Sequence, residues 1–195
     1  MPGGQERALR RRINSVQSTK QITRAMELIA ATRVVKAMTR ANAARPYSTK
    51  MTGVIEDLAA GGVGIDDPLL RSSETVSSIG FVVITSDRGL AGAYNSSVIR
   101  AAEKEIMAAQ TEGKEYKLVL VGKKAADYFR FRNYQIEASF SGMTDTPSYE
   151  DARVVATTVR DLFVSEAVDQ VILAYQEFVS MGTQRVAVRK FLPLE

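Results

Sequence analysis

The segment Ser86–Asn95 (SDRGLAGAYN) is where the residue types come closest to a phosphate-binding motif. It follows a β-branched run, Ile79–Thr85, which is the position at which doubly wound domains bind nucleotide phosphates. However, Gly89 and Gly92 form only part of a dinucleotide fingerprint, and no Walker-type GKS or GKT occurs in the chain. We favour a structural turn, in which these glycines permit a tight connection and Asp87 and Arg88 pair or cap locally. We expect no cofactor at this turn.

The composition removes several other kinds of chemistry. The chain has no cysteine and no histidine, so it lacks the most common general base and the most common ligands of transition metals. No pair of carboxylates has a spacing that requires a catalytic role. These absences argue against an independent enzyme. The sequence also lacks a long apolar run and a secretory signal, which predicts a cytoplasmic protein or one on the cytoplasmic face of a membrane.

Basic residues are concentrated near the N-terminus. Residues 1–50 contain eleven Lys and Arg against two Glu, a balance of +9, whereas the rest of the chain has a balance of −5. The three arginines Arg10–Arg12 could bind the phosphates of a nucleic acid. However, the basic residues are distributed around the predicted helix, and no aromatic residue before Tyr47 is present to stack on bases. An acidic protein partner accounts better for this surface, and a nucleic-acid-binding arm is the alternative.

The same segment predicts a very long helix. Gln5–Arg45 contains 41 residues without glycine or proline, enough for a helix of about 60 Å. Apolar residues recur every three or four positions, with a shift of register between Val16 and Ile22 where Lys20 intervenes. Pro46 is expected to kink or briefly interrupt the helix. We expect a helical unit over residues 1–60 and a linker over residues 61–74, which is rich in glycine and aspartate.

Strand-like and helical segments alternate over residues 75–195. The predicted strands are Ile79–Thr85, Lys117–Val121, Gln135–Phe140, Gln170–Tyr175 and Gln184–Phe191. Three helices are predicted. The first runs from about Asn95 to Thr111, and the second is short, follows the strand Lys117–Val121 and ends at Tyr128. The third begins with a first turn opened by Pro147 and runs to about Ser165. This alternation predicts an α/β unit with an open, Rossmann-like and largely parallel sheet of about five strands.

Three motifs resemble the γ subunit of F-type ATP synthases. They are Gln21–Ala31 (QITRAMELIAA), Arg45-Pro46-Tyr47 and Thr85–Gly92 (TSDRGLAG), followed in order by Gly142-Met143, Pro147-Ser148 and Phe191–Leu194. Ala91 stands where the family often has cysteine. The resemblance implies that the N-terminal helix is half of an antiparallel coiled coil. Because the family normally continues for roughly another hundred residues into the second helix, we expect this chain to lack that helix.

The resemblance also implies a function, that of the central-stalk rotor of a proton-translocating ATP synthase. In that family the helix turns inside a hexamer of α and β subunits, which hold the catalytic sites, while the α/β unit contacts the ε subunit and the membrane c-ring. The implied subunit has no catalytic residue, no small-molecule substrate and no nucleic acid partner. The family match places Met26 near acidic loops of the hexamer; charge and helical proximity add Lys20, Arg24, Arg33 and Lys36. Besides the nucleic-acid-binding arm, a small nucleotide-dependent enzyme is a third hypothesis.

Overall fold

The computed structural model describes residues 2–60 and 67–194, which form two compact units, Met1–Val63 and Gly64–Glu195. The first unit is a single helix, α1, from Pro2 to Ala60. Its 59 residues correspond to a length of about 90 Å. The second unit contains one 3₁₀ turn, three α-helices and five strands within the described residues.

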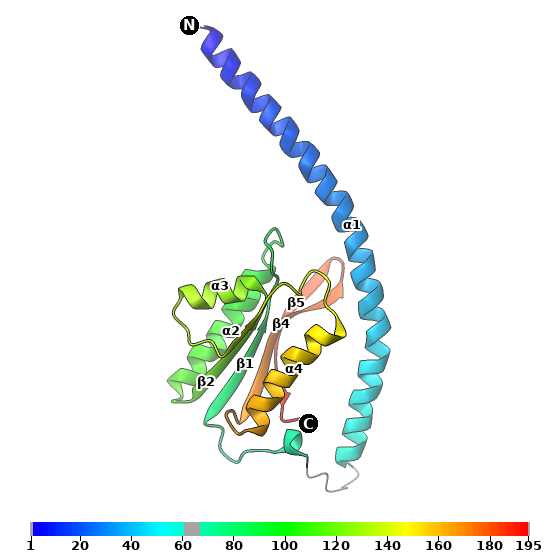
Figure 1. The fold of residues 1–195 in the computed structure, drawn as a ribbon, viewed down its shortest axis with the longest axis vertical. Helices are drawn as coiled ribbons and strands as arrows, with labels where there is room; N and C mark the ends of the chain where they lie inside the picture. The colour runs from blue at the N-terminus through cyan, green and yellow to red at the C-terminus, as the bar shows by residue number, and fades with distance from the viewer. Residues whose placement is uncertain (1, 61–66, 195) are drawn as a thin grey trace. The chain divides into compact units, whose positions relative to one another are not determined.

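Pro46 is expected to kink or interrupt the helix, and the interruption is wrong, because α1 runs through this residue without a break. Proline removes one N–H from the helical ladder and its ring crowds the preceding turn, which costs stability but leaves the hydrogen bonds on either side intact. Figure 1 shows α1 changing direction gradually along its length while remaining one helix. The long flanking runs of helix-forming residues therefore outweigh the cost of one internal proline.

The second unit is built on a mostly parallel sheet, as the alternating pattern predicts (Figure 1). Its elements in chain order are η1 (Pro68–Leu70), β1 (Ser78–Ile84), α2 (Tyr94–Thr111), β2 (Glu115–Val121), α3 (Lys123–Phe131), β3 (Ala138–Phe140), α4 (Tyr149–Val164), β4 (Gln170–Ser180) and β5 (Thr183–Leu192). The sheet order is β3-β2-β1-β4-β5. The strands β1 to β4 pair in parallel, and β5 pairs antiparallel with β4. Loops that follow β1, β2 and β3 therefore meet at one edge of the sheet.

Alternating side chains of β1 divide the core between the two faces of the sheet. Phe81 and Val83 pack with residues of α2 and α3, whereas Val82 packs with Val159 and Phe163 of α4. All of β1 between its end residues is buried, so this strand is covered on both faces, as a continuous β-branched run allows. The central strand thus fixes the positions of the loops at its carboxyl end.

Most boundaries differ by a few residues from the sequence-based predictions, and three of the differences have a clear structural reason. The α4 helix begins after Pro147, because Ser148 is its N-cap and forms a reciprocal capping box with Asp151. The β3 strand covers only Ala138–Phe140, the residues that pair with β2. The β4 strand continues to Ser180, because the β4–β5 hairpin pairs beyond the part of β4 that contacts β1.

Part of the expected linker, residues 61–66, lies outside the described residues. In the remainder, Asp67 caps the η1 turn by accepting a hydrogen bond from the Leu69 amide at 2.8 Å. Residues after η1 bond to Phe163 of α4 and to Asp169, which directly precedes β4.

Candidate functional site

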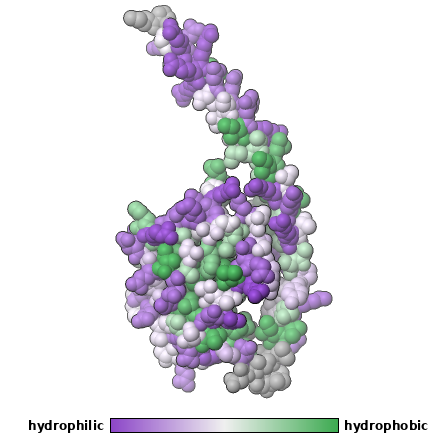
Figure 2. Space-filling view, in the orientation of Figure 1, coloured by the Kyte–Doolittle hydropathy of each residue, from purple (hydrophilic) through white to green (hydrophobic). Residues whose placement is uncertain are grey.

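Large apolar side chains are exposed along α1. They are Leu9, Ile13, Val16, Ile22, Met26, Leu28, Ile29, Val34, Val35, Tyr47, Met51 and Val54. Figure 2 shows hydrophobic side chains interspersed with hydrophilic ones along this helix. Most helical stability in water comes from burying an apolar face, so a helix of this kind fits contact with other polypeptide.

The exposed apolar side chains lie on more than one side of α1. At 100° per residue, the group Leu9, Ile13 and Val16 is centred about 140° around the axis from the group Ile22, Met26 and Ile29. The supercoil of a heptad repeat accounts for only about 20° per heptad, so one straight partner helix would not cover both groups. This distribution favours contact with several surrounding elements.

The predicted contact residues are also distributed around α1. Met26, Arg33 and Lys36 fall within an arc of about 80° on one side. Lys20 and Arg24 fall on the other side, where Arg24 forms an ion pair with Glu27 at 2.7 Å. The helix therefore brings three of the five residues together, while the other two face elsewhere.

The predicted turn residue Asp87 joins three segments of the second unit. Its Oδ1 accepts a hydrogen bond from the Lys123 amide at 2.9 Å, and its Oδ2 accepts from the Thr144 hydroxyl at 2.7 Å and the Thr144 amide at 3.1 Å. The Asp87 amide in turn donates to the Thr144 hydroxyl at 2.9 Å. Asp87 thus fastens the loop after β1 to the start of α3 and to the loop after β3.

These hydrogen bonds lower the pKa of Asp87. Burial raises it, but bonds from the Thr144 hydroxyl and from the Gly142, Thr144 and Lys123 backbones outweigh burial and bring the pKa from 3.8 to about 2. The carboxylate is therefore charged at neutral pH. A charged acceptor at the first residue of α3 is also favoured by the positive end of the helix dipole.

The residues Thr85, Ser86 and Asp87 together cap the amino end of α3. Besides the Asp87 bond, the Ser86 carbonyl accepts from the Lys124 amide at 3.1 Å, and the buried Thr85 hydroxyl accepts from the Ala125 amide at 3.0 Å. These amides could otherwise bind an anion. Since protein oxygens already occupy them, this arrangement supports a packing role for the motif.

Arg88 bonds across to another loop, because its guanidinium pairs with Asp145 at 2.9 Å. Gly92 has a φ of +55° and Leu90 a φ of 60°, so the left-handed residues of this turn are Leu90 and Gly92, and Gly89 is not among them. Thr144 is the partner of Asp87, and Asp145 is the partner of Arg88. Neither partner could be identified from the sequence, since each lies 57 residues away.

An apolar cavity of about 480 Å³ lies between α4 and the sheet, near the carboxyl end of β1. Apolar side chains such as Ile84, Met143, Val155 and Phe191 line it. Its polar lining includes Thr85, Ser86, Thr144 and Asp151, each of which is hydrogen-bonded within the protein. Such a lining offers little to a nucleotide.

Within residues 2–60 and 67–194, none of the helices is both long and apolar enough to cross a membrane. The same ranges contain no cluster of three or more acidic side chains arranged to hold a metal ion.

Comparisons with known proteins agree with the long helix and mostly parallel sheet. Residues 5–195 match the family described as ATP synthase. The ATP synthase γ chain of Kineococcus radiotolerans is 44% identical over 98% of this chain, and that of Frankia casuarinae is 45% identical over 98%. This chain spans 65% of the length of each relative. The chain belongs to the ATP synthase γ-chain family.

A solved structure shares the fold. It is the central stalk and c-ring of the mitochondrial ATP synthase of Tetrahymena thermophila, and a chain in it superposes with a TM-score of 0.68 at 24% identity. The similarity covers 88% of this chain and 72% of that chain. The predicted fold class is therefore confirmed.

Proposed function

We propose that this chain acts as the central-stalk rotor subunit of a proton-translocating F-type ATP synthase. In this role α1 turns inside a hexamer of α and β subunits, and the second unit contacts the ε subunit and the membrane c-ring. The catalytic sites belong to the hexamer, so the chain itself is not an enzyme. The complex lies on the cytoplasmic face of the cell membrane.

The observation that carries this proposal is the exposure of large apolar side chains on different sides of α1, in a chain of this family. A shaft enclosed by a ring is contacted from all directions, which suits both the two apolar groups and the distribution of Lys20, Arg24, Met26, Arg33 and Lys36. We also propose that part of the apolar surface is covered by a second helix, as one half of an antiparallel coiled coil. The additional length of the relatives leaves room for such a helix.

The rotor would bias each catalytic site by presenting different faces in turn, which is a shift of conformational populations by differential contact. Individual exposed ion pairs on the shaft would contribute only about 0–1 kcal/mol each. Shape should therefore carry most of the torque, with basic side chains guiding the fit to acidic loops. The turn containing Asp87, Arg88, Gly89 and Gly92 would serve packing of the second unit or contact with neighbouring subunits.

Assembly with purified α and β subunits tests this proposal. We expect the full-length subunit carrying this sequence to co-purify with the hexamer and to alter its ATP hydrolysis. The matched variant replaces Ile22, Met26 and Ile29, which are exposed on α1, with asparagine, and we expect its binding to the hexamer to weaken. Equal binding of both proteins would contradict the role of α1.

The family match disfavours a nucleic-acid-binding arm. If that function were correct, the chain would bind generic duplex DNA with an affinity that falls steeply with salt, because phosphate contacts release counterions. Such binding, together with failure to join the hexamer, would favour the alternative.

A further inference from the structure

The apolar cavity of about 480 Å³ lies where the strand order of the sheet reverses. After β1 the chain builds β2 and β3 on one side of that strand, and it then crosses to β4 on the other side. The cavity is lined by Ile84 at the end of β1, Val121 at the end of β2 and Leu173 of β4. Open α/β sheets bind ligands at such a switch point, beyond the carboxyl ends of the strands. The fold therefore places this cavity in the usual position of a ligand site.

Small side chains of α4 leave the cavity unfilled. Ala152 and Ala156, one helical turn apart, line it together with Val155, and both alanines are exposed. Within residues 67–194, α4 is the single α-helix that packs on this face of the sheet, whereas α2 and α3 pack on the other face. Protein interiors contain few voids larger than a water molecule, so a hollow of this size beside the core has room for an occupant.

The charge of the lining restricts what the cavity can hold. Its one carboxylate is Asp151, and none of the described lining residues is a lysine or an arginine. Hydrogen bonds from the Ser148 hydroxyl at 2.7 Å and the Ser148 amide at 2.9 Å lower the pKa of Asp151, so this group is charged at neutral pH. An anion entering the cavity would lose hydration without gaining a cationic partner. The lining therefore favours a neutral molecule.

Tyr94 offers one hydrogen-bonding group to such a molecule. It is the first residue of α2 and lines the cavity. Burial raises the pKa of Tyr94 above 10.0, so its hydroxyl stays protonated at neutral pH. Within residues 67–194 this hydroxyl has no hydrogen-bond partner in the protein, unlike those of Thr85, Ser86 and Thr144. The phenol can therefore donate a hydrogen bond to an occupant.

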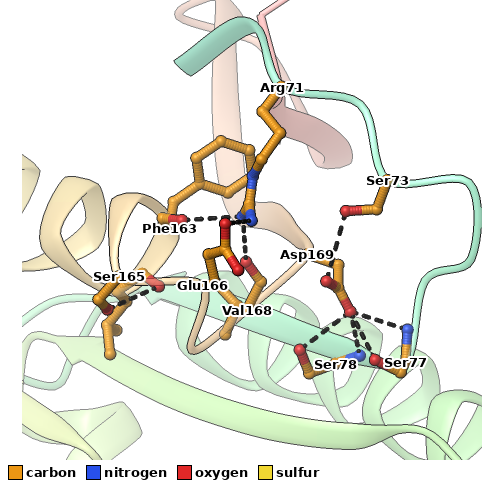
Figure 3. Close-up of polar contacts among 10 residues, drawn as sticks. Arg71, Ser73, Ser77, Ser78, Phe163, Ser165, Glu166, Val168 and Asp169 are labelled. Atoms are coloured by element: carbon orange, nitrogen blue, oxygen red, sulfur yellow. Dashed lines mark hydrogen bonds and ion pairs between the residues drawn. The ribbon is translucent and has the colours of Figure 1, made fainter. Parts of the chain in front are cut away.

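A second hollow, of about 540 Å³, lies at the carboxyl end of α4 and has a different chemistry. Its charged side chains include Arg71 and Glu166, which pair at 2.9 Å. Arg71 also donates to the Phe163 carbonyl at 2.9 Å and to the Val168 carbonyl at 3.3 Å (Figure 3). Since protein groups already satisfy this guanidinium, the hollow offers less to a ligand than the apolar cavity does.

We propose that the apolar cavity binds a neutral, largely hydrophobic small molecule with one polar group that accepts a hydrogen bond from Tyr94. Its volume falls within the range of about 300–1,000 Å³ that is typical of small-molecule sites. Met143, in the loop after β3, is a flexible side chain that can adapt to the shape of an occupant. A bound molecule would contact the loops after β1 and β3 and the first turns of α4 together. The site lies entirely within the second unit, so it does not depend on the proposed rotor function.

Two probes with the same aromatic rings test the chemistry of the site. The 195-residue chain is labelled with ¹⁵N and titrated with 1-naphthol, which is neutral and carries one hydroxyl, or with 1-naphthalenesulfonate, which is anionic. We expect 1-naphthol to shift amide resonances of residues 84–86, 94, 143–144 and 151–156, with a dissociation constant on the order of 1 mM. The sulfonate should bind at least about tenfold more weakly.

Substitutions that fill the cavity test its location. Ala156→Leu and Ala152→Leu each place a larger side chain on its wall, and we expect either to weaken 1-naphthol binding more than about tenfold. The matched control is Ala108→Leu, the same change at an exposed position of α2 that does not line the cavity, and its binding should equal wild type. Tyr94→Phe should weaken binding about threefold, because one hydrogen bond is lost.

The position of the shifts separates this site from the exposed apolar side chains of α1, which could also attract an aromatic probe. Shifts confined to residues 2–60, or no shifts at all, would overturn the proposal in the wild-type chain alone. Equal binding by Ala156→Leu and Ala108→Leu would remove the cavity as the site. Sulfonate binding as tight as that of 1-naphthol would overturn the assignment of a neutral ligand.

Discussion

Replacing Asp87 with alanine removes the carboxylate that joins the loop after β1, the start of α3 and the loop after β3. The bonds to its oxygens that are lost include those from the Lys123 amide and from the hydroxyl and amide of Thr144, at 2.9, 2.7 and 3.1 Å. A helix cap contributes about 1 kcal/mol, and bonds to a charged acceptor contribute about 1.5–3 kcal/mol before the remaining groups are rehydrated. Because Asp87 is partly exposed, we expect a net loss of about 2–3 kcal/mol in the unfolding free energy. This corresponds to a Tm lower by about 10 °C.

The loss should depend on pH in a defined direction. The pKa of Asp87 is lowered from 3.8 to about 2 in the folded protein, so its charged form stabilises the fold above about pH 4. That contribution disappears as the pH falls through 2. The difference in unfolding free energy between wild type and Asp87→Ala should therefore be largest at neutral pH and shrink steadily in acid.

Chemical denaturation followed by tyrosine circular dichroism measures both quantities. The matched control is Asp161→Ala, because Asp161 is exposed on α4 and pairs with the adjacent Arg160. We expect the control to change the unfolding free energy by less than about 0.5 kcal/mol. An Asp87→Ala protein as stable as the control at pH 7, or a loss that stays constant down to pH 2, would refute the assignment of Asp87 as a charged cap.

Four further outcomes follow from the same structure. Gly122→Ala would place a Cβ 2.3 Å from the Thr85 carbonyl oxygen, so we expect a loss above about 3 kcal/mol, whereas Gly113→Ala, with open space around it, should cost only about 1 kcal/mol; equal losses would contradict the close approach. Ser148→Ala removes the cap of α4 and should cost about 1 kcal/mol in a denaturation experiment, and no change would show that the capping box does not form. Met26→Lys in the assembled complex should reduce protons pumped per ATP hydrolysed more than it reduces assembly, and normal pumping would remove Met26 from the contact. In a dilute monomer, amides of residues 8–44 should exchange rapidly, and strong protection there would mean that the chain covers its own shaft.

Local patterns predicted most of the elements. The β-branched run that forms β1 and the glycine-free stretch within α1 carry their periodicity in consecutive residues, so both could be assigned without tertiary information. The cap of α4 was also present in the sequence, as Ser148 followed three residues later by Asp151. The predicted start was placed at Pro147 instead, because proline is common in the first turn of a helix. The predicted interruption at Pro46 was wrong because the low helix propensity of one proline does not overcome the helix-forming residues on both sides of it.

Contacts between distant segments could not be predicted in this way. The sequence predicts local pairing or capping for Asp87, whereas its partner Thr144 lies 57 residues away and is brought to it because β1, β2 and β3 lie in one parallel sheet. Arg71 was not identified, because its partners at the end of α4 are more than ninety residues away in sequence. The composition of residues 61–74 does not show which of their side chains bond to distant parts of the second unit.

We propose that the chain is a rotor, and rotation itself is the most direct measurement of that role. The hexamer is fixed to a surface, a bead is attached to the second unit of the full-length subunit, and its angle is followed as ATP is hydrolysed. We expect the bead to turn in one direction in steps coupled to hydrolysis. Steady ATP hydrolysis by the assembled complex with a bead that shows only thermal fluctuation about a fixed angle would contradict the claim.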